Sequence, residues 1–568
     1  MERIGTLSAA PPRRPNGAGG RTVRWRSDLG LSDGAVSLGA GLFHRLAISC
    51  HAHRVERDRA RIGVALSGGG HRASLFAAGA LLGLVDASVQ TRVVSISSVS
   101  GGSITNGIVA ASGDLQGMDR AALEAALRPG IEVFARQGLF FPGRVTDRYV
   151  QVTLALCAAA AGAAAAVVIH GVWWVAVAAA VLAVAVIGRL VATRAVPVLT
   201  GAGVLAGCVS GGALVAAVPW FLSSAWATLA GQVALTLALA GAAVAVLGRR
   251  ALVVDNALHA GLLGQMSLSG ADRPVHHVFC ASDMSGGRFC FLTPRVVYGY
   301  ALGAGTPNPA LRLSTAVQAS ACFPGGFPPR RLTAADLTAA PLRQASVDLT
   351  DGGVYDNMAD EWEFGWPDRL TRYPHLAAIQ PAAAGTLIVV NAGKPWTAVS
   401  LPRRGLRREV RSLLAAADIQ GAITTRLRRR YLVDLFLHPR DSDPTGCLIH
   451  IEQTLTGPAQ QRLNDPDPAV AARAGQVLDL IGRLTPDDPA YSETLPARNT
   501  RVPTVLRALG AQTATDLMHH AYLLTRLNLY LHLGEGTLPG PNDPLDDWAR
   551  DRFTQLAGPP DITPGTPA

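Results

Sequence analysis

The feature that most constrains this chain of 568 residues is a central stretch that is almost free of charge. No Asp, Glu, Lys or Arg occurs between positions 149 and 188 or between positions 195 and 248. A helix needs about 20 mostly apolar residues to cross a bilayer, so each stretch is long enough for two crossings. We therefore predict an all-α transmembrane insertion at 149–250, with helices near 151–169, 171–188, 196–221 and 228–247.

The residues at the ends of these helices predict their orientation. Tryptophans, which favour the membrane interface, lie near the two outer turns at positions 173, 174, 220 and 226. Arginines flank the opposite ends at positions 144, 148, 189, 194, 249 and 250. The positive-inside rule places the arginine-rich ends in the cytoplasm. We therefore expect an integral protein of the inner or plasma membrane whose catalytic domain is cytoplasmic.

The overall composition agrees with a membrane-embedded part. Apolar residues make up 49% of the chain and charged residues 16%, and the mean hydropathy is +0.24. The net charge of +10 suits either nucleic acid or an anionic membrane surface. Because the chain has no helix-turn-helix, zinc-ligand spacing or aromatic-basic stripe, we favour the membrane and expect no nucleic-acid partner. Seven scattered cysteines without a C-x-x-C pair indicate a reducing compartment and no structural metal.

A glycine-rich turn follows the first predicted strand, at 61–66. The turn reads Ser67-Gly68-Gly69-Gly70-His71-Arg72 and leads into apolar helical spacing over 73–85. Backbone amides at a helix N-terminus bind anions. The phosphate-loop and dinucleotide patterns are both absent, which favours the oxyanion of an attacked ester. Arg72 is a candidate for additional positive charge beside this site.

A serine occupies a second strand-to-helix corner, at Ser97–Asn106 (S-S-V-S-G-G-S-I-T-N). A β-branched run at 92–96 predicts the strand, and 104–111 predicts the helix. Ser100 lies between them, as in a nucleophile elbow, although Ser98 replaces the first glycine of G-x-S-x-G. Taken alone, such a string is equally typical of an ordinary βα turn.

A carboxylate on a turn is the third element. The segment 347–357 (V-D-L-T-D-G-G-V-Y-D-N) predicts a short strand that ends at Asp351, and the two glycines leave the following backbone open to approach. Before it, the stiff loop 323–329 (F-P-G-G-F-P-P) is predicted to line a pocket. By itself, an Asp-Gly-Gly string is simply a turn.

In this chain order the three elements resemble the patatin-like phospholipase family, as a bacterial, membrane-anchored member. The resemblance covers about 61–111 and 252–391. It rests on S-G-G-G-H-R, S-V-S-G-G, A-S-A-C-F-P-G-G-F-P-P and D-G-G-V-Y-D-N. It implies an α/β sandwich with a mostly parallel central sheet, here interrupted by the insertion. Ser98 and Ala73 depart from the usual glycines of the family motifs.

The resemblance implies a Ser-Asp dyad without histidine that cleaves acyl esters of lipids through an acyl-enzyme. On the family's motif Ser100 is the nucleophile, Asp351 is its base, and the amides of Gly68, Gly69 and Gly70 form the oxyanion hole. It implies no metal and no cofactor, and a membrane phospholipid or lysophospholipid as substrate. The two dyad residues flank the insertion and must meet, so the chain has to cross the bilayer an even number of times, which four helices satisfy.

Five regions follow from this interpretation. They are a disordered basic arm (1–45), the two halves of the catalytic domain (46–148 and 251–400), the insertion (149–250), and a mostly helical C-terminal extension with a disordered tail (401–568).

Within the C-terminal extension, 403–430 is dense in arginine with apolar residues at helical spacing. It fits a helix on an anionic membrane surface or a solvated helix face. We predict strands at 433–437 and 448–451, and a helix packed on the core at 514–533.

Two alternatives remain open at this point. The first is an α/β-hydrolase with a Ser-His-Asp triad, and the second is a membrane scaffold without catalysis. The histidines that follow Asp351 and would complete a triad are His375, His438, His450, His519, His520 and His532.

Overall fold

A computed structural model describes most of the chain outside the N-terminal arm and the first three predicted membrane helices. The described ranges are 58–139, 225–338, 343–374, 383–395, 406–440, 443–484, 491–538 and 545–558, with a few positions within 149–161 and position 376. The predicted basic arm at 1–45 lies outside these residues.

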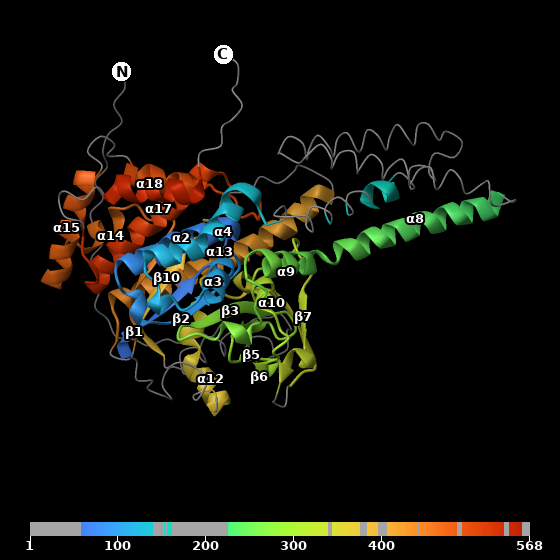
Figure 1. The fold of residues 1–568 in the computed structure, drawn as a ribbon, viewed down its shortest axis with the longest axis horizontal. Helices are drawn as coiled ribbons and strands as arrows, with labels where there is room; N and C mark the ends of the chain where they lie inside the picture. The colour runs from blue at the N-terminus through green and yellow to red at the C-terminus, as the bar shows by residue number, and fades with distance from the viewer. Residues whose placement is uncertain are drawn as a thin grey trace, which may run out of the picture. The chain divides into compact units, whose positions relative to one another are not determined.

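A mixed sheet of eleven strands organises the described chain (Figure 1). Its parallel half has the order β11 (Thr445–His450), β10 (Ala384–Asn391), β1 (Asp58–Leu66), β2 (Val93–Ser98) and β3 (His276–Asp283). The expected α/β class and the strands predicted at 61–66, 92–96 and 448–451 are confirmed.

Beyond β3 the sheet is antiparallel. It continues through β4 (Arg288–Leu292), β5 (Val297–Gly299), β6 (Gly303–Pro307) and β8 (Leu337–Thr338). Strand β9 (Ser346–Asp351) pairs antiparallel with both β3 and β7 (Arg330–Thr333). The sheet is therefore parallel in one half only, because short turns such as the one between β3 and β4 return the chain antiparallel.

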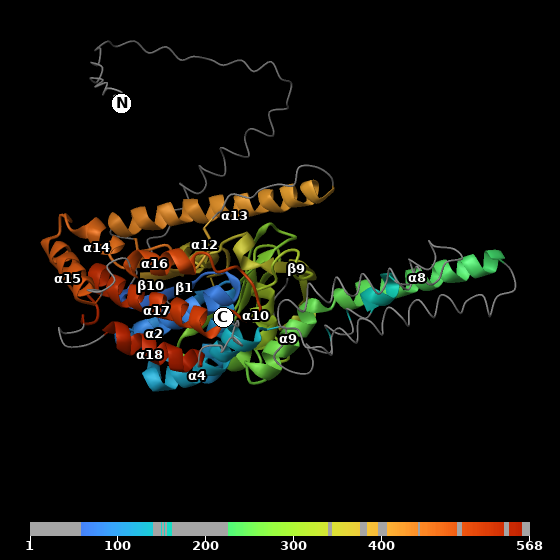
Figure 2. The same ribbon diagram turned by 90° about the horizontal axis from the view of Figure 1, so that it is seen from above.

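Helices cover both faces of the parallel half, and alternate residues of each strand divide between two cores. Ile62 and Val64 of β1 belong to the larger core, while Ala65 belongs to the smaller one. Such burial on both faces explains why these strands are continuous apolar runs. In Figure 2, α2 (Gly70–Asp86) and α13 (Leu406–Leu437) lie on opposite sides of β1 and β10.

Helices from the first and the last parts of the described chain pack together in the larger core. Its helices are α2, α3 (Gly101–Ser112), α4 (Arg120–Glu132), α9 (Arg250–Gly261), α10 (Leu313–Ser320), α15 (Pro468–Leu484), α16 (Tyr491–Asn499), α17 (Ala511–Asn528) and α18 (Leu545–Ala557). The short α14 (Gly457–Arg462) packs beside α15. A Cβ on Gly79 of α2 would lie 2.1 Å from the Met518 carbonyl oxygen, so α17 packs on α2 at backbone contact.

The smaller core holds Trp362 of α11 (Glu361–Phe364), with α12 (Trp366–Arg372) following in the chain. Helix α13 contributes Leu432 to it. The strand predicted at 433–437 is wrong, because these residues are the last turn of α13. Leu432 and Leu435 are both buried, and their spacing of three places them on one face of a helix.

Only part of the predicted membrane insertion can be compared with the structure. Helix α8 (Ala225–Leu247) matches the fourth predicted crossing. Within the described residues, one helix, Gln232–Gly261, is long and apolar enough to cross a bilayer, with a mean hydropathy of 1.8. The other three predicted crossings lie outside the described residues, except for helical positions at 153 and 156–161. The count of four therefore stays a prediction.

Candidate active site

Ser100 occupies the sharp corner between β2 and α3. Its backbone has φ 51° and ψ −120°, a positive-φ conformation that costs a non-glycine residue on the order of 1–3 kcal/mol. Its amide donates to the Ser320 carbonyl oxygen at 3.2 Å, and the residue is 9% exposed. The strand-to-helix corner predicted from the sequence is confirmed.

The glycines after Ser100 allow the start of α3 to touch the glycine-rich turn. A Cβ on Gly101 would lie 2.0 Å from the Gly70 carbonyl oxygen, and one on Gly102 would lie 2.7 Å from the Leu66 and Ser67 carbonyl oxygens. Real Cβ atoms are not found at such distances, so both positions require glycine. The two predicted turns therefore pack backbone against backbone.

Ser98, which replaces the first glycine of the elbow pattern, lies in a buried hydrogen-bond network. Its hydroxyl donates to the Val278 carbonyl oxygen at 3.0 Å and accepts from the Asn106 amide group at 2.8 Å. Asn106 in turn is hydrogen-bonded to His277 at 2.7 Å. Serine suits this position because its hydroxyl joins β2 to β3 behind the corner.

The glycine-rich turn presents two unused amides. Gly69 and Gly70 have φ values of 145° and 61°, which favour glycine. The Gly68 amide donates to the Asn357 carbonyl oxygen at 3.0 Å, whereas the amides of Gly69 and Gly70 have no acceptor among the described residues. This bond removes Gly68 from the donors available to a ligand, although the sequence had placed it with the other two. The remaining two amides lie at the N-terminus of α2.

Arg72 is fully buried rather than a surface residue of the first helical turn. Its Nε donates to the Ala392 carbonyl oxygen at 2.9 Å and its Nη1 to the Val502 carbonyl oxygen at 2.6 Å. Nη2 has no hydrogen-bond partner among the described residues and would lie 2.9 Å from a Cβ on Gly69. Burial lowers the pKa of Arg72 to about 10, so it remains charged at neutral pH, directly behind the turn.

Asp351 ends β9 beside Ser100. Its carboxylate accepts from the Gly353 amide at 2.8 Å. The Ser100 hydroxyl lies near enough to this carboxyl group to lower its pKa. Burial raises the pKa of this carboxyl group to about 6, and the Gly353 amide and the Ser100 hydroxyl oppose that rise. The structure thus brings together the serine and the aspartate that the sequence predicted, from opposite sides of the insertion.

The end of α10 connects these two residues, a role that the sequence did not reveal. The Ser320 carbonyl oxygen accepts from the Ser100 amide, and two residues later the Cys322 carbonyl oxygen accepts from the Asp351 amide at 2.9 Å. The Ser320 hydroxyl also donates to the Cys280 carbonyl oxygen at 2.6 Å, which fixes the segment to β3. The only sequence signal was position, since Ser320 and Cys322 lie within the quoted A-S-A-C-F-P string.

Asn357 is a second residue whose contacts the sequence did not indicate. Its carbonyl oxygen holds the Gly68 amide, and its side-chain oxygen would lie 2.4 Å from a Cβ on Gly68 and 2.7 Å from one on Gly353. It therefore fills the space between the glycine-rich turn and the Asp351 turn. The D-G-G-V-Y-D-N string contains Asn357 but does not show this packing.

The histidines after Asp351 have other partners. The His519 ring is hydrogen-bonded to the Tyr491 hydroxyl at 3.0 Å, and the His520 ring to the Gln453 carbonyl oxygen at 3.0 Å. Burial lowers the pKa of His450 to about 3 and that of His520 to about 4. Among the described residues no histidine is hydrogen-bonded to Ser100 or Asp351; His375 lies outside them.

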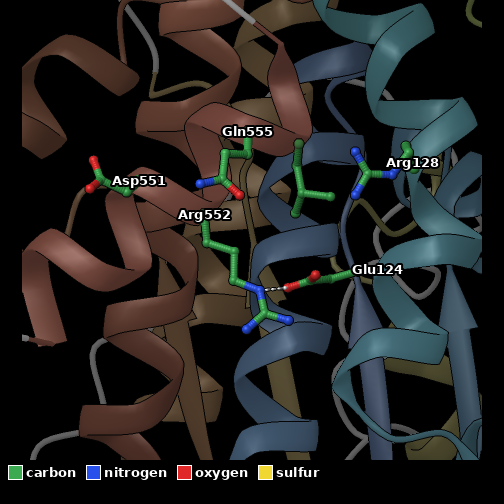
Figure 3. A pocket seen from close by; sticks show the side chains of 6 residues that line it. Glu124, Arg128, Asp551, Arg552 and Gln555 are labelled. Atoms are coloured by element: carbon green, nitrogen blue, oxygen red, sulfur yellow. Dashed lines mark ion pairs between the residues drawn. The ribbon is translucent and has the colours of Figure 1, made fainter.

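A surface hollow lies elsewhere, between α4 and α18 (Figure 3). It has a volume of about 470 Å³, and the Arg552 guanidinium forms an ion pair with Glu124 at 2.7 Å inside it. Its lining residues are Glu124, Arg128, Asp551, Arg552, Gln555 and Leu556. None of them belongs to the predicted site. The described part of the chain contains no cluster of three or more His, Cys, Asp or Glu residues suited to a metal ion.

Comparisons with known proteins show only distant likeness. No family model matches the chain, and no curated protein sequence matches it. Among solved structures it is similar to human GIVD cytosolic phospholipase A2, with a TM-score of 0.34 and 11% identity over 90% of this chain. It spans 65% of that human chain. It is also similar to VipD from Legionella pneumophila, with a TM-score of 0.23 and 12% identity over 90% of this chain and 93% of that one. At these TM-scores neither likeness assigns a site or an activity.

Proposed function

We propose that this chain is a membrane-anchored serine acyl hydrolase of the patatin-like type, which cleaves carboxyl esters of lipids as a phospholipase A or lysophospholipase. The observation that carries the proposal is the pairing of a serine in a strained corner with a buried aspartate, whose pKa the serine hydroxyl lowers. A serine hydroxyl becomes an effective nucleophile when a positioned base accepts its proton.

Asp351 is suited to act as that base. Its pKa of about 6 leaves it ionised at neutral pH, while making it a stronger proton acceptor than an exposed aspartate. The Gly353 amide and the backbone bond to Cys322 hold the carboxylate in place. With Asp351 in this role the dyad needs no histidine.

The oxyanion of the tetrahedral intermediate would be bound by the amides of Gly69 and Gly70. Neither has an acceptor among the described residues, both stand at the positive end of the α2 dipole, and the charge of Arg72 lies behind them. One well-placed donor of this kind is worth about 3 kcal/mol of transition-state stabilisation. Gly68 would contribute by holding the turn through its bond to Asn357.

The reaction would then proceed in two steps. The Ser100 oxygen first bonds to the acyl carbon as its proton passes to Asp351. The ester C–O bond then breaks, and the proton leaves with the alcohol product, which is a lysolipid or a glycerol-type headgroup. Water next attacks the acyl-enzyme, giving its proton to Asp351, and a fatty acid is released with the Ser100 hydroxyl restored.

Exposed apolar surface supports anchoring to a membrane. On α8, Val233, Leu237 and Val244 are 40%, 67% and 68% exposed, which is unusual for a helix of a soluble core. Helix α13 similarly exposes Ile423 and Leu427 beside arginines, the arrangement of a helix on an anionic bilayer. We infer that the catalytic part stays on the cytoplasmic side, where its substrate leaflet lies.

The test is ester hydrolysis by the full chain purified in detergent, on a short-chain ester and on mixed phospholipids. Ser100→Ala and Asp351→Asn should each lower hydrolysis of both substrates by roughly a thousandfold or more. Asp348→Asn is a matched control, since this aspartate lies on the same strand and pairs with Arg331 at the surface. Activity that survives Ser100→Ala would contradict the assignment of the nucleophile, whereas a wild type that is inactive on both substrates would favour the non-catalytic scaffold.

A further inference from the structure

Two exposed apolar side chains, Phe323 and Val354, lie on the segments that hold Asp351; we call them the apolar rim. Phe323 is 44% exposed and directly follows Cys322, whose carbonyl oxygen accepts from the Asp351 amide. Val354 is 57% exposed and ends the single helical turn Gly352–Val354 that Asp351 caps. Both exposed apolar side chains therefore lie on segments bound to the backbone on either side of Asp351.

The loop geometry holds the Phe323 ring in its exposed position. The ring lies directly over Gly326, where a Cβ would come within 2.0 Å of it, and it packs edge-on against Phe327 with centroids 5.2 Å apart. Phe327 is buried and anchors the pair. Gly325 has φ 82°, which the tight turn between the two rings requires. The ring is therefore preorganised for contact and pays little conformational entropy on binding.

Val354 is fixed in a comparable way. A Cβ on Gly352 would lie 2.2 Å from the Cys280 carbonyl oxygen, so the turn sits tightly on β3. After Val354, the Tyr355 amide donates to the Ser282 hydroxyl at 3.1 Å. Both ends of the turn are thus held to β3, while the valine side chain remains in solvent.

We propose that the apolar rim enters the acyl layer of a lipid bilayer and delivers lipid esters to Ser100. This inference rests on the proposed function. The position and chemistry of the rim indicate that it contacts lipid. Ser100 is only 9% exposed, and the backbone connects the rim directly to Asp351, the proposed partner of Ser100. An ester with long apolar chains would exchange the membrane for apolar side chains rather than for water.

The experiment compares two substrates with one set of full-length variants in detergent-purified or reconstituted protein. The substrates are a short-chain ester dissolved as monomers and a phospholipid in vesicles. The variants are Phe323→Ser, Val354→Ser and the double substitution. Phe323→Leu tests whether another apolar side chain at this position preserves hydrolysis of the phospholipid in vesicles. Leu463→Ser is the matched control, because Leu463 is 42% exposed and lies at the end of α14, outside the site.

The expected result is a fall of roughly tenfold or more in the ratio of vesicle to monomer kcat/KM for the double variant. Phe323→Leu should keep most of the wild-type ratio, and Leu463→Ser should change neither rate. An unchanged ratio in the double variant would overturn the proposal. A change in the oligomeric state of the double variant would also overturn it, because the rim would then be an interface between copies of the chain. A wild-type protein that cleaves neither ester would instead overturn the proposed function, and the rim with it.

Discussion

Replacing Asp351, the proposed base, by its neutral isostere asparagine should stabilise the folded protein while it abolishes the proposed activity. The Asp351 carboxyl has a pKa of about 6 in the folded protein and an ordinary value of 3.8 when exposed. Each pKa unit corresponds to about 1.36 kcal/mol, so keeping this group ionised costs the folded state about 3 kcal/mol. Asparagine has the same shape, and its oxygen can still accept from the Gly353 amide.

The pH dependence identifies the cause of this effect. Below pH 3.8 the carboxyl is protonated in both the folded and the unfolded chain, and the cost disappears. As the pH rises through 6 the cost reaches its full value, because the folded state holds the proton more tightly than the unfolded one. We therefore expect Asp351→Asn to raise the free energy of unfolding by about 3 kcal/mol at pH 8 but by less than about 1 kcal/mol at pH 4.

Thermal unfolding followed by intrinsic fluorescence in detergent measures this difference. For a cooperative unit of roughly 500 residues, about 3 kcal/mol raises the unfolding midpoint by about 3 °C. Asp348→Asn provides the contrast, because the surface ion pair with Arg331 lowers the pKa of Asp348 and its removal should not stabilise the fold. A lower midpoint for Asp351→Asn at pH 8, or an equal gain at pH 4 and pH 8, would refute the reasoning.

Two further predictions concern the same site. Hydrolysis should depend on pH, with kcat/KM half-maximal near pH 6 and falling at lower pH as Asp351 takes up a proton; a profile that stays flat from pH 5 to 8 would exclude this carboxylate as the base. Gly101→Ala should destabilise the fold by about 2 kcal/mol or more and reduce hydrolysis, since the added Cβ meets the Gly70 carbonyl oxygen at 2.0 Å. Gly117→Ala, where no atom lies within 4 Å of the new Cβ, should change stability by less than about 0.5 kcal/mol in the same unfolding assay.

Local patterns were enough to predict the elements that carry the site. The apolar run 61–66 and the helical spacing over 73–85 became β1 and α2, and the serine corner at Ser100 lies where it was expected. These predictions succeed because strand and helix periodicity, and the need for glycine in tight turns, act over a few neighbouring residues.

Patterns that depend on packing were misjudged. The run 433–437 was predicted as a strand but continues a helix, because Leu432 and Leu435 are buried on one helical face and Leu432 packs in the smaller core. Arg428, one turn earlier, lies among Asp356, Asp360 and Glu361, with the nearest nitrogen–oxygen separations at 3.3 and 3.5 Å for the two aspartates. Nothing near position 430 in the sequence signals these distant partners.

The sequence by itself determined the chemical groups of the candidate site and the local turns that present them: a serine after a strand, three glycines before a helix, and an aspartate at a strand end. Only the tertiary structure decided how they act together. It placed Asp351 near Ser100, raised the pKa of the carboxyl by burial, and bound the Gly68 amide to the Asn357 carbonyl oxygen. It left the amides of Gly69 and Gly70 without an acceptor among the described residues. Burial and long-range hydrogen bonds depend on residues that are remote in the chain, so local sequence patterns do not predict them.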